Sequence, residues 1–333
     1  MSIRMPILAT IAVLIAALVL PSAPGDAQVS ENVDFRVTVL GSGSPLPSVT
    51  RFGPSIMVQA GKETLLFDAG RGVSQRMWQA RVPLNRMDAL FITHLHSDHI
   101  VGIPDLWLTG WLIGDYGRRS TPFRVWGPAG TRELMDGIQA AYRRDVEMRT
   151  ADQKLPKDGI AVEVTEFKEG VIYDRNGVKV TAIEVDHGPI ITPAFGFRVD
   201  YDGRSVVISG DTRGSDNLVR HAKGTDLLLH NVVTARDGLI EKSPAVKNVL
   251  SRLAAPEDAG TVFTRAAPRL AAFYHFVFQS SPEFPPVTEQ EIIDTTRRTY
   301  AGPLVLSEDL MAFVITREGV RVVQPPASSL RGP

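Results

Sequence analysis

The sequence contains no cysteine among its 333 residues. Disulfide bonds are therefore excluded, and so are thiolate ligands for any metal that the chain binds. A metal site must be built from histidine, aspartate and glutamate side chains. Histidine is itself scarce, with seven in the chain, so a cluster of histidines is informative.

The chain also lacks an excess of charge of either sign. Its 36 basic and 37 acidic side chains give a formal net charge of −1 at pH 7. Bulk electrostatics therefore offer no attraction to a polyanion, and a nucleic-acid substrate would need a local basic surface. Internal repeats and low-complexity linkers are absent from the sequence, and a hydrophobic content of 44% allows a substantial core.

The apolar stretch at residues 7–20 is too short to span a bilayer. It follows Arg4 and precedes a small-residue segment that ends at Ala27. This pattern indicates a secretory signal peptide over residues 1–27, with an uncleaved N-terminal anchor as the alternative. We therefore predict a protein exported by a bacterium, periplasmic or secreted, with no stable membrane span after cleavage.

Apolar and alternating runs after the leader predict strands with interspersed helices. Strand patterns cover residues 34–40, 55–59, 63–67, 89–93, 123–126, 162–166, 179–184, 194–200 and 204–209, and helical patterns cover 72–80, 130–144 and 288–300. This succession indicates an α/β sandwich with sheets inside and helices outside. We place the folded domain at residues 34–320, a surface loop at 143–159 and a flexible tail at 321–333.

Three of the seven histidines fall within six residues, at His94, His96 and His99, with Asp98 beside the last. Residues 88–93 before them form a buried-strand pattern, so the cluster is expected at a strand's end, where a rigid scaffold positions loop side chains. Imidazoles and a carboxylate are the ligands that zinc takes when thiolates are missing. The cluster therefore predicts a metal site.

The run Thr93-His94-Leu95-His96-Ser97-Asp98-His99 resembles the metal-binding signature of the metallo-β-lactamase superfamily. Other segments are similar to its ribonuclease Z and arylsulfatase-like branch, in that branch's order. They are Leu40-Gly41-Ser42-Gly43-Ser44-Pro45, Arg51, Leu66-Phe67-Asp68-Ala69-Gly70, Gly102, Asp186-His187-Gly188, Ser209-Gly210-Asp211-Thr212, His230 and Tyr274-His275. The resemblance covers roughly residues 34–310 and implies a four-layer αββα sandwich.

The resemblance also implies a site for two zinc ions, with manganese or iron as alternatives. It assigns His94, His96 and His187 to the first metal, Asp98, His99 and His275 to the second, and Asp211 to the bridge between them. Two neighbouring cations need such an anionic bridge to offset their repulsion, and a bridging water would be acidified into an attacking hydroxide.

Roles are also expected for three single residues and for one glycine-containing loop. Asp98 is expected both to bind metal and to orient the hydroxide as a general base. His230 either aids departure of the leaving oxygen or is structural, because Asn231 stands where the branch usually has glutamate. Asp68 either accepts a hydrogen bond from a liganding imidazole or caps a turn. The Gly41-Ser42-Gly43 loop either cradles an anion or forms a tight turn.

Motif spacing guides the substrate prediction. Ribonuclease Z enzymes hold transfer RNA with a long arm between the third metal histidine and the bridging aspartate, whereas here only residues 188–210 separate His187 from Asp211. Together with the leader and the near-neutral charge, this argues against nucleic acid as a partner. We therefore predict a metal-dependent hydrolase of small anionic esters, either aryl sulfates or phosphodiesters, and leave a homodimer open.

Four alternatives stay open. They are a ribonuclease Z-type phosphodiesterase on nucleic acid, a lactone or β-lactam hydrolase, a metal-binding accessory protein without turnover, and redox chemistry on a di-iron version of the site. The opening at residues 40–45 and the ending at Tyr274-His275 point away from a β-lactamase. The complete set of expected ligands, Asp98 included, points away from an accessory protein.

Overall fold

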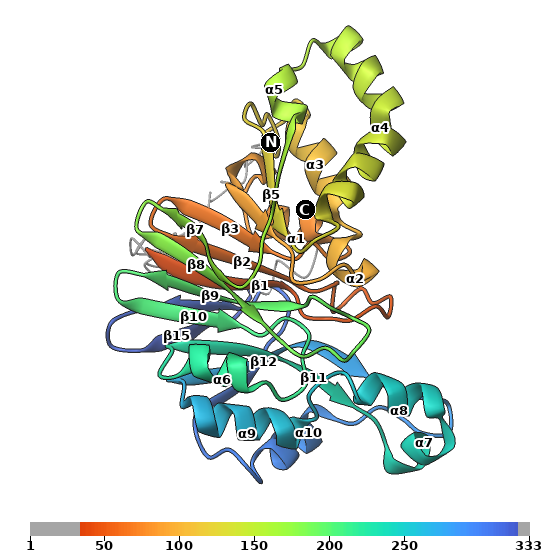
Figure 1. Cartoon of the computed structure of the whole chain (residues 1–333), viewed down its shortest axis with the longest axis vertical. Coiled ribbons are helices and arrows are strands. Elements are labelled where there is room, and N and C mark those ends of the chain that lie inside the picture. Colours follow the sequence, from red (N-terminus) through yellow and green to blue (C-terminus); the bar gives the residue numbers. More distant parts are fainter. Residues whose placement is uncertain (1–33, 326–333) are drawn as a thin grey trace, which may run out of the picture. The chain divides into compact units, whose positions relative to one another are not determined.

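Two mixed β-sheets stack face to face in the computed structural model, which describes residues 34–325 (Figure 1). The strands of the first sheet are β1 (Phe35–Gly41), β2 (Ser55–Ala60), β3 (Glu63–Phe67), β4 (Ala89–Phe91), β5 (Phe123–Gly127), β6 (Val162–Glu166), β14 (Ala312–Ile315) and β15 (Val320–Val323). Their order across the sheet is β15-β14-β1-β2-β3-β4-β5-β6.

The second sheet has the order β13-β12-β11-β10-β9-β8-β7. Its strands are β7 (Gly170–Arg175), β8 (Val178–Glu184), β9 (Phe195–Tyr201), β10 (Arg204–Ile208), β11 (Leu227–Thr234), β12 (Leu270–Phe278) and β13 (Leu304–Leu306). The pairs from β13 to β10 are parallel, and the pairs from β10 to β7 are antiparallel, so the orientation changes at β10.

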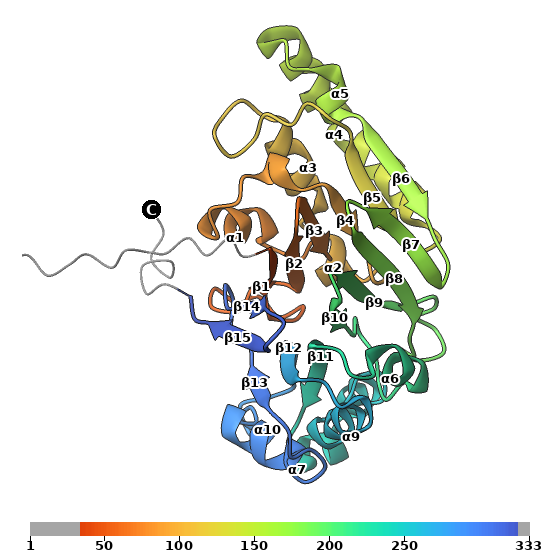
Figure 2. The same cartoon turned by 90° about the vertical axis from the view of Figure 1, so that its left-hand side faces the viewer.

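Helices cover the outer faces of both sheets (Figures 1 and 2). On the first sheet lie α1 (Val73–Gln79), α3 (Ile103–Trp111) and α4 (Thr131–Gln153), and on the second lie α6 (Asp216–Ala222), α9 (Pro256–Ala266) and α10 (Glu289–Thr296). The shorter helices are α2 (Ser97–Ile100), α5 (Lys157–Ile160), α7 (Asp237–Lys242), α8 (Pro244–Leu250) and the 3-10 helix η1 (Leu84–Arg86). The predicted four-layer αββα sandwich is confirmed.

Strand β10 shows how the sequence produces these layers. Val206 and Ile208 point into the core between the two sheets, whereas Val207 points into the core beneath α6 and α9. A strand buried on both faces needs apolar residues at every position, because successive side chains alternate between faces. The continuous apolar run of β10 therefore places it in the middle of the sandwich.

Two boundary predictions are wrong. Residues 143–159 are not a surface loop, because α4 continues through Gln153 and α5 follows it. The extension is held by the packing of Val146 against the outer core and by an ion pair of 2.9 Å between Arg149 and Asp145 one helical turn apart. The domain boundary at residue 320 falls inside β15, which pairs with β14.

The predicted leader, residues 1–27, lies outside the described residues, as do residues 326–333 of the predicted tail. Between residues 34 and 325, no helix combines the length and apolar character that a bilayer crossing requires.

Candidate metal centre

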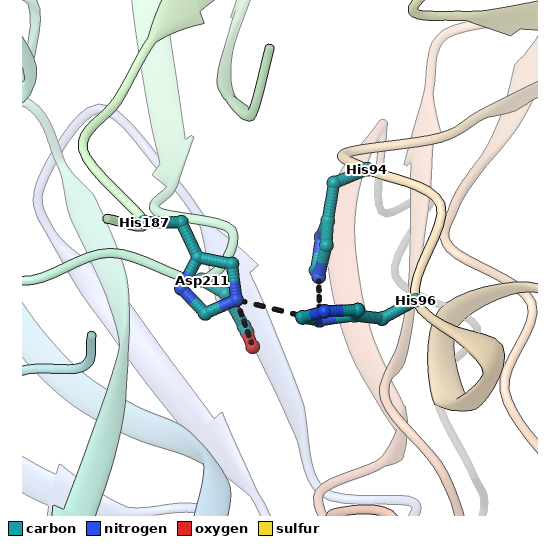
Figure 3. Close-up of side chains that lie close together, drawn as sticks. All are labelled: His94, His96, His187 and Asp211. Carbon is teal, nitrogen blue, oxygen red and sulfur yellow. Dashed lines mark hydrogen bonds and ion pairs between the residues drawn. The ribbon is translucent and has the colours of Figure 1, made fainter. Parts of the chain in front are cut away.

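The predicted ligands follow strands of both sheets and meet at one edge of the sandwich. His94 and His96 lie in the loop after β4, whereas His187 follows β8 and Asp211 follows β10. Figure 3 shows these four side chains converging from the two sides of the site. Helix α2 supplies Asp98 and His99, and β12 supplies His275.

The side chain of His275 is aimed by an irregularity in its own strand. The register between β11 and β12 shifts at this point, and His275 has a φ of 47°. A bulge of this kind re-aims a side chain and is common beside active sites. The imidazole of His275 therefore lies at the site, whereas the neighbouring Tyr274 packs in the core between the sheets.

A first group of donor atoms is formed by His94, His96, His187 and Asp211, all within 4.8 Å of one another. His94 Nε2 lies 2.8 Å from His96 Nδ1, and His187 Nε2 lies 3.4 Å from the same atom (Figure 3). His96 is exposed, whereas the other three are buried. The group therefore opens to solvent on the side of His96.

A second group consists of Asp98, His99 and His275, again with donor atoms within 4.8 Å of one another. The two Nε2 atoms of His99 and His275 are 3.1 Å apart, and Asp98 Oδ2 lies 3.4 Å from His275 Nε2. All three residues are buried.

Asp211 connects the two groups. Its Oδ2 lies 3.6 Å from Nε2 of both His187 and His99, and its Oδ1 lies 3.2 Å from His275 Nε2. One carboxylate thus reaches donors on both sides, which is the position that a bridging ligand requires.

Neighbouring groups fix the orientation of the imidazoles. Asp68 Oδ2 lies 2.7 Å from His99 Nδ1, and Asp68 also accepts hydrogen bonds from the backbone N–H and hydroxyl of Thr93. His187 Nδ1 lies 3.0 Å from the carbonyl oxygen of Arg252. Such partners on the far nitrogen set the tautomer and leave the near nitrogen free to bind a metal.

Charge differs between the two groups. Burial lowers the pKa of the His94 imidazole well below its usual value, and burial also lowers the pKa of His96. Burial acts in the same direction on His99, but the nearby carboxylates of Asp68 and Asp211 outweigh it and raise the pKa of His99 well above its usual value. Burial is likewise outweighed at His275, where Asp211 raises the pKa to about 9.

These donors fit a divalent metal pair. The first group offers neutral imidazoles. In the second group, His99 and His275 hold protons beside carboxylates, and a bound cation would replace these protons. The buried Nδ1 of His275 also has no hydrogen-bond partner among residues 34–325. Nitrogen and oxygen donors without sulfur suit zinc, manganese or iron.

A cavity of about 380 Å³ opens over both groups. Five candidate ligands line it, namely His96, Asp98, His187, Asp211 and His275. The rest of its wall is formed by Ser44, Pro45, Leu46, Val249, Arg252, Leu253, Val277, Phe278, Gln279 and Ser280. Most of this wall was not predicted, because its members come from three separate segments of the chain and only Ser44 and Pro45 belong to a recognised motif.

His230 does not line this cavity and is fully buried. Its Nδ1 lies 2.9 Å from the carbonyl oxygen of Asn231, and its ring packs edge-on against Phe263. Burial lowers the pKa of His230 to about 4, so the imidazole is neutral near pH 7. This environment favours the structural alternative for His230 over the proton-donor alternative.

In the Gly41-Ser42-Gly43 loop, backbone amides donate hydrogen bonds to other groups of the protein. Ser42 N–H donates to Asp309 and Gly43 N–H donates to the carbonyl oxygen of Phe52. A Cβ at Gly41 would stand 1.9 Å from the carbonyl oxygen of Gly53, so only glycine fits. The loop is a tight turn that places Ser44 and its neighbours in the cavity wall.

Comparison with known proteins agrees with this site. The family model described as "Beta-lactamase superfamily domain" matches residues 63–276. Ribonuclease Z of Mycobacterium bovis is 33% identical over 278 residues, which cover 83% of this chain and 96% of that enzyme. Ribonuclease Z of Mycolicibacterium gilvum is 37% identical over 245 residues, which cover 73% of this chain and 84% of that enzyme.

The crystal structure of human tRNase Z, short form, has a TM-score of 0.62, with 23% identity over 87% of this chain and 99% of that one. At this identity the likeness shows the fold alone. Fold and sequence relatives together support a metal-dependent hydrolase of the phosphodiesterase type.

The predicted substrate class is wrong. The relatives named ribonuclease Z overturn both the small anionic ester and the exclusion of nucleic acid as a partner. The prediction relied on a short path from His187 to Asp211, on the leader and on net charge, and none of these describes the groups that surround a substrate. The chain belongs to the β-lactamase superfamily, in its ribonuclease Z branch.

Proposed function

We propose that this protein is a ribonuclease Z-type phosphodiesterase that cleaves RNA. The observation that carries the proposal is the 33–37% identity to enzymes named ribonuclease Z, over most of both chains. Two donor groups joined by Asp211 beneath one cavity support it, because such a site can hold two metals at a phosphodiester.

We assign His94, His96 and His187 to one zinc ion, Asp98, His99 and His275 to the other, and Asp211 to both. When bound, the two ions would act as Lewis acids that stabilise the negative charge developing on the phosphate oxygens. Asp68 and the carbonyl oxygen of Arg252 would keep His99 and His187 in the tautomer that presents Nε2 to the site.

Asp98 would accept the proton of the attacking water at its carboxylate. Burial raises its pKa, but His99 and the hydrogen bond to His275 outweigh burial and hold the pKa of Asp98 below its usual value. The carboxylate is therefore ionised at neutral pH, and it lines the cavity in which the phosphate would lie.

The test is cleavage of a precursor transfer RNA by the zinc-loaded protein, with the position of the cut mapped on a labelled 3′ trailer. We expect a cut at the junction of the mature RNA and its trailer, and no cut by the Asp98→Asn control. Absence of cleavage by protein with a full metal load would overturn the proposal.

We propose separately that the leader directs export. The proposal is supported by the composition of residues 1–27 and concerns cellular location alone. Mass spectrometry of the protein from an expressing bacterium should give a chain that begins at Gln28 in the periplasm or medium. A cytoplasmic chain that begins at residue 1 or 2 would contradict export.

A further inference from the structure

The cavity over the metal centre has one cationic side chain in its wall apart from the histidines. Among the residues that line it, Arg252 is the only arginine or lysine. Its apolar neighbours are Leu46, Val249, Leu253, Val277 and Phe278, and they make most of the remaining wall apolar. A charged group in such surroundings has fewer water molecules to screen it than one on the open surface.

The position of Arg252 is fixed by the metal centre itself. Its carbonyl oxygen accepts the hydrogen bond from His187 Nδ1, 3.0 Å away. Its side chain runs beside Gly188, where an added Cβ would stand 3.4 Å from Arg252 Cγ. The backbone of Arg252 thus orients His187, and the residue is also part of the cavity wall.

The guanidinium of Arg252 has no anionic partner in residues 34–325. Neither an ion pair nor a hydrogen bond from its side chain is present in this range, although other arginines near the site are paired. Arg213, for example, lies 2.8 Å from the carboxylate of Asp186. An unpaired arginine in a cavity wall is suited to bind an anion from outside the chain.

We propose that Arg252 binds a phosphate group of the substrate inside this cavity. The inference rests on the proposed function for the identity of the substrate. Among the residues that line the cavity, Arg252 is the sole source of positive charge besides the metal centre. The bidentate fork of the guanidinium matches phosphate oxygens in geometry as well as charge.

The test measures binding of uridine 5′-monophosphate, which offers a phosphate but no phosphodiester bond for the enzyme to cleave. Isothermal titration calorimetry is performed on the zinc-loaded full chain, its Arg252→Gln and Arg252→Lys variants, and Arg265→Gln as a matched control. Arg265 lies on α9, is half exposed and pairs with Asp216. Metal content is measured on every sample by mass spectrometry.

We expect Arg252→Gln to bind the nucleotide about tenfold more weakly, because a charge-assisted hydrogen bond is lost. Arg252→Lys should retain part of the affinity, and Arg265→Gln should bind like the wild type. The metal content of Arg252→Gln should be unchanged, since the carbonyl oxygen that holds His187 remains.

Equal affinity of wild type and Arg252→Gln would overturn the proposal. Metal loss in Arg252→Gln would also overturn it, because the residue would then act through His187. Failure to cleave precursor RNA together with an Arg252-dependent nucleotide affinity would remove the proposed function and leave the phosphate site standing. Cleavage of precursor RNA, with the same nucleotide affinity in wild type and Arg252→Gln, would support the proposed function and remove the phosphate site.

Discussion

Asp68 Oδ2 lies 2.7 Å from His99 Nδ1, and both side chains are buried. The contact fixes the imidazole so that Nε2 faces His275 and Asp211. The metal centre therefore depends on a carboxylate that does not line the cavity.

Replacement of Asp68 by Ala should weaken metal binding by about 10- to 100-fold, because the imidazole of His99 loses the partner that sets its tautomer. Competition with a chromogenic chelator would measure the affinity. Asp88→Ala is the matched control, since Asp88 accepts a hydrogen bond from Thr64 at the other end of β4. Equal metal affinity in wild type and Asp68→Ala would contradict a role for Asp68 at the metal centre.

Replacement of Asp98 by Ala should lower turnover by about 10²- to 10⁴-fold, the range that general acid–base catalysis contributes. It should also reduce occupancy of the second metal, because one residue serves both roles. Single-turnover cleavage and metal analysis would test the two effects on the same sample. Wild-type turnover in this variant would remove Asp98 from the mechanism.

His230 should make stability depend on pH between about 6.5 and 4. Its pKa is lowered to about 4 by burial, so the unfolded chain binds a proton in this window that the folded chain does not. Stability should therefore fall as the pH falls through the window, by up to about 3 kcal/mol. Urea titrations from pH 7 to pH 4 should show a steeper loss in wild type than in His230→Gln. Parallel curves would show that His230 does not account for the loss.

A buried ion pair holds the turn at residues 41–43. Arg76 Nη2 lies 2.9 Å from Asp309 Oδ2, and Asp309 also accepts from the N–H of Ser42. Asp309→Ala leaves the arginine unpaired in the interior and should cost about 3–5 kcal/mol of unfolding free energy. The exposed pair of Arg265 and Asp216 offers the control, because Asp216→Ala should cost at most about 1 kcal/mol. Similar losses in both variants would contradict this account of the turn.

Local patterns in the sequence were sufficient to predict much of the fold. The strands 63–67 and 162–166 have the predicted bounds, because each is a short apolar or alternating run with turn residues beside it. The end of α4 was not predictable in this way. Its last turns are highly charged, and they stay helical through the tertiary packing of Val146 and through ion pairs between charged side chains.

The site residues also differ in how far the sequence alone could predict them. His94, His96 and His99 could be predicted because they fall within six consecutive residues, whereas His187, Asp211 and His275 required a family resemblance to join them. Arg252 escaped prediction because its position depends on how the segment between α8 and α9 packs against His187. The substrate class was mispredicted because motif spacing, the leader and net charge do not describe the groups that surround a substrate.

The metal content of the zinc-reconstituted and dialysed protein tests most directly whether the seven side chains form one dinuclear centre. The account predicts about two zinc ions per chain in the wild type and fewer in Asp211→Ala, because Asp211 reaches both donor groups. One zinc ion per chain, or the same content in wild type and Asp211→Ala, would contradict it.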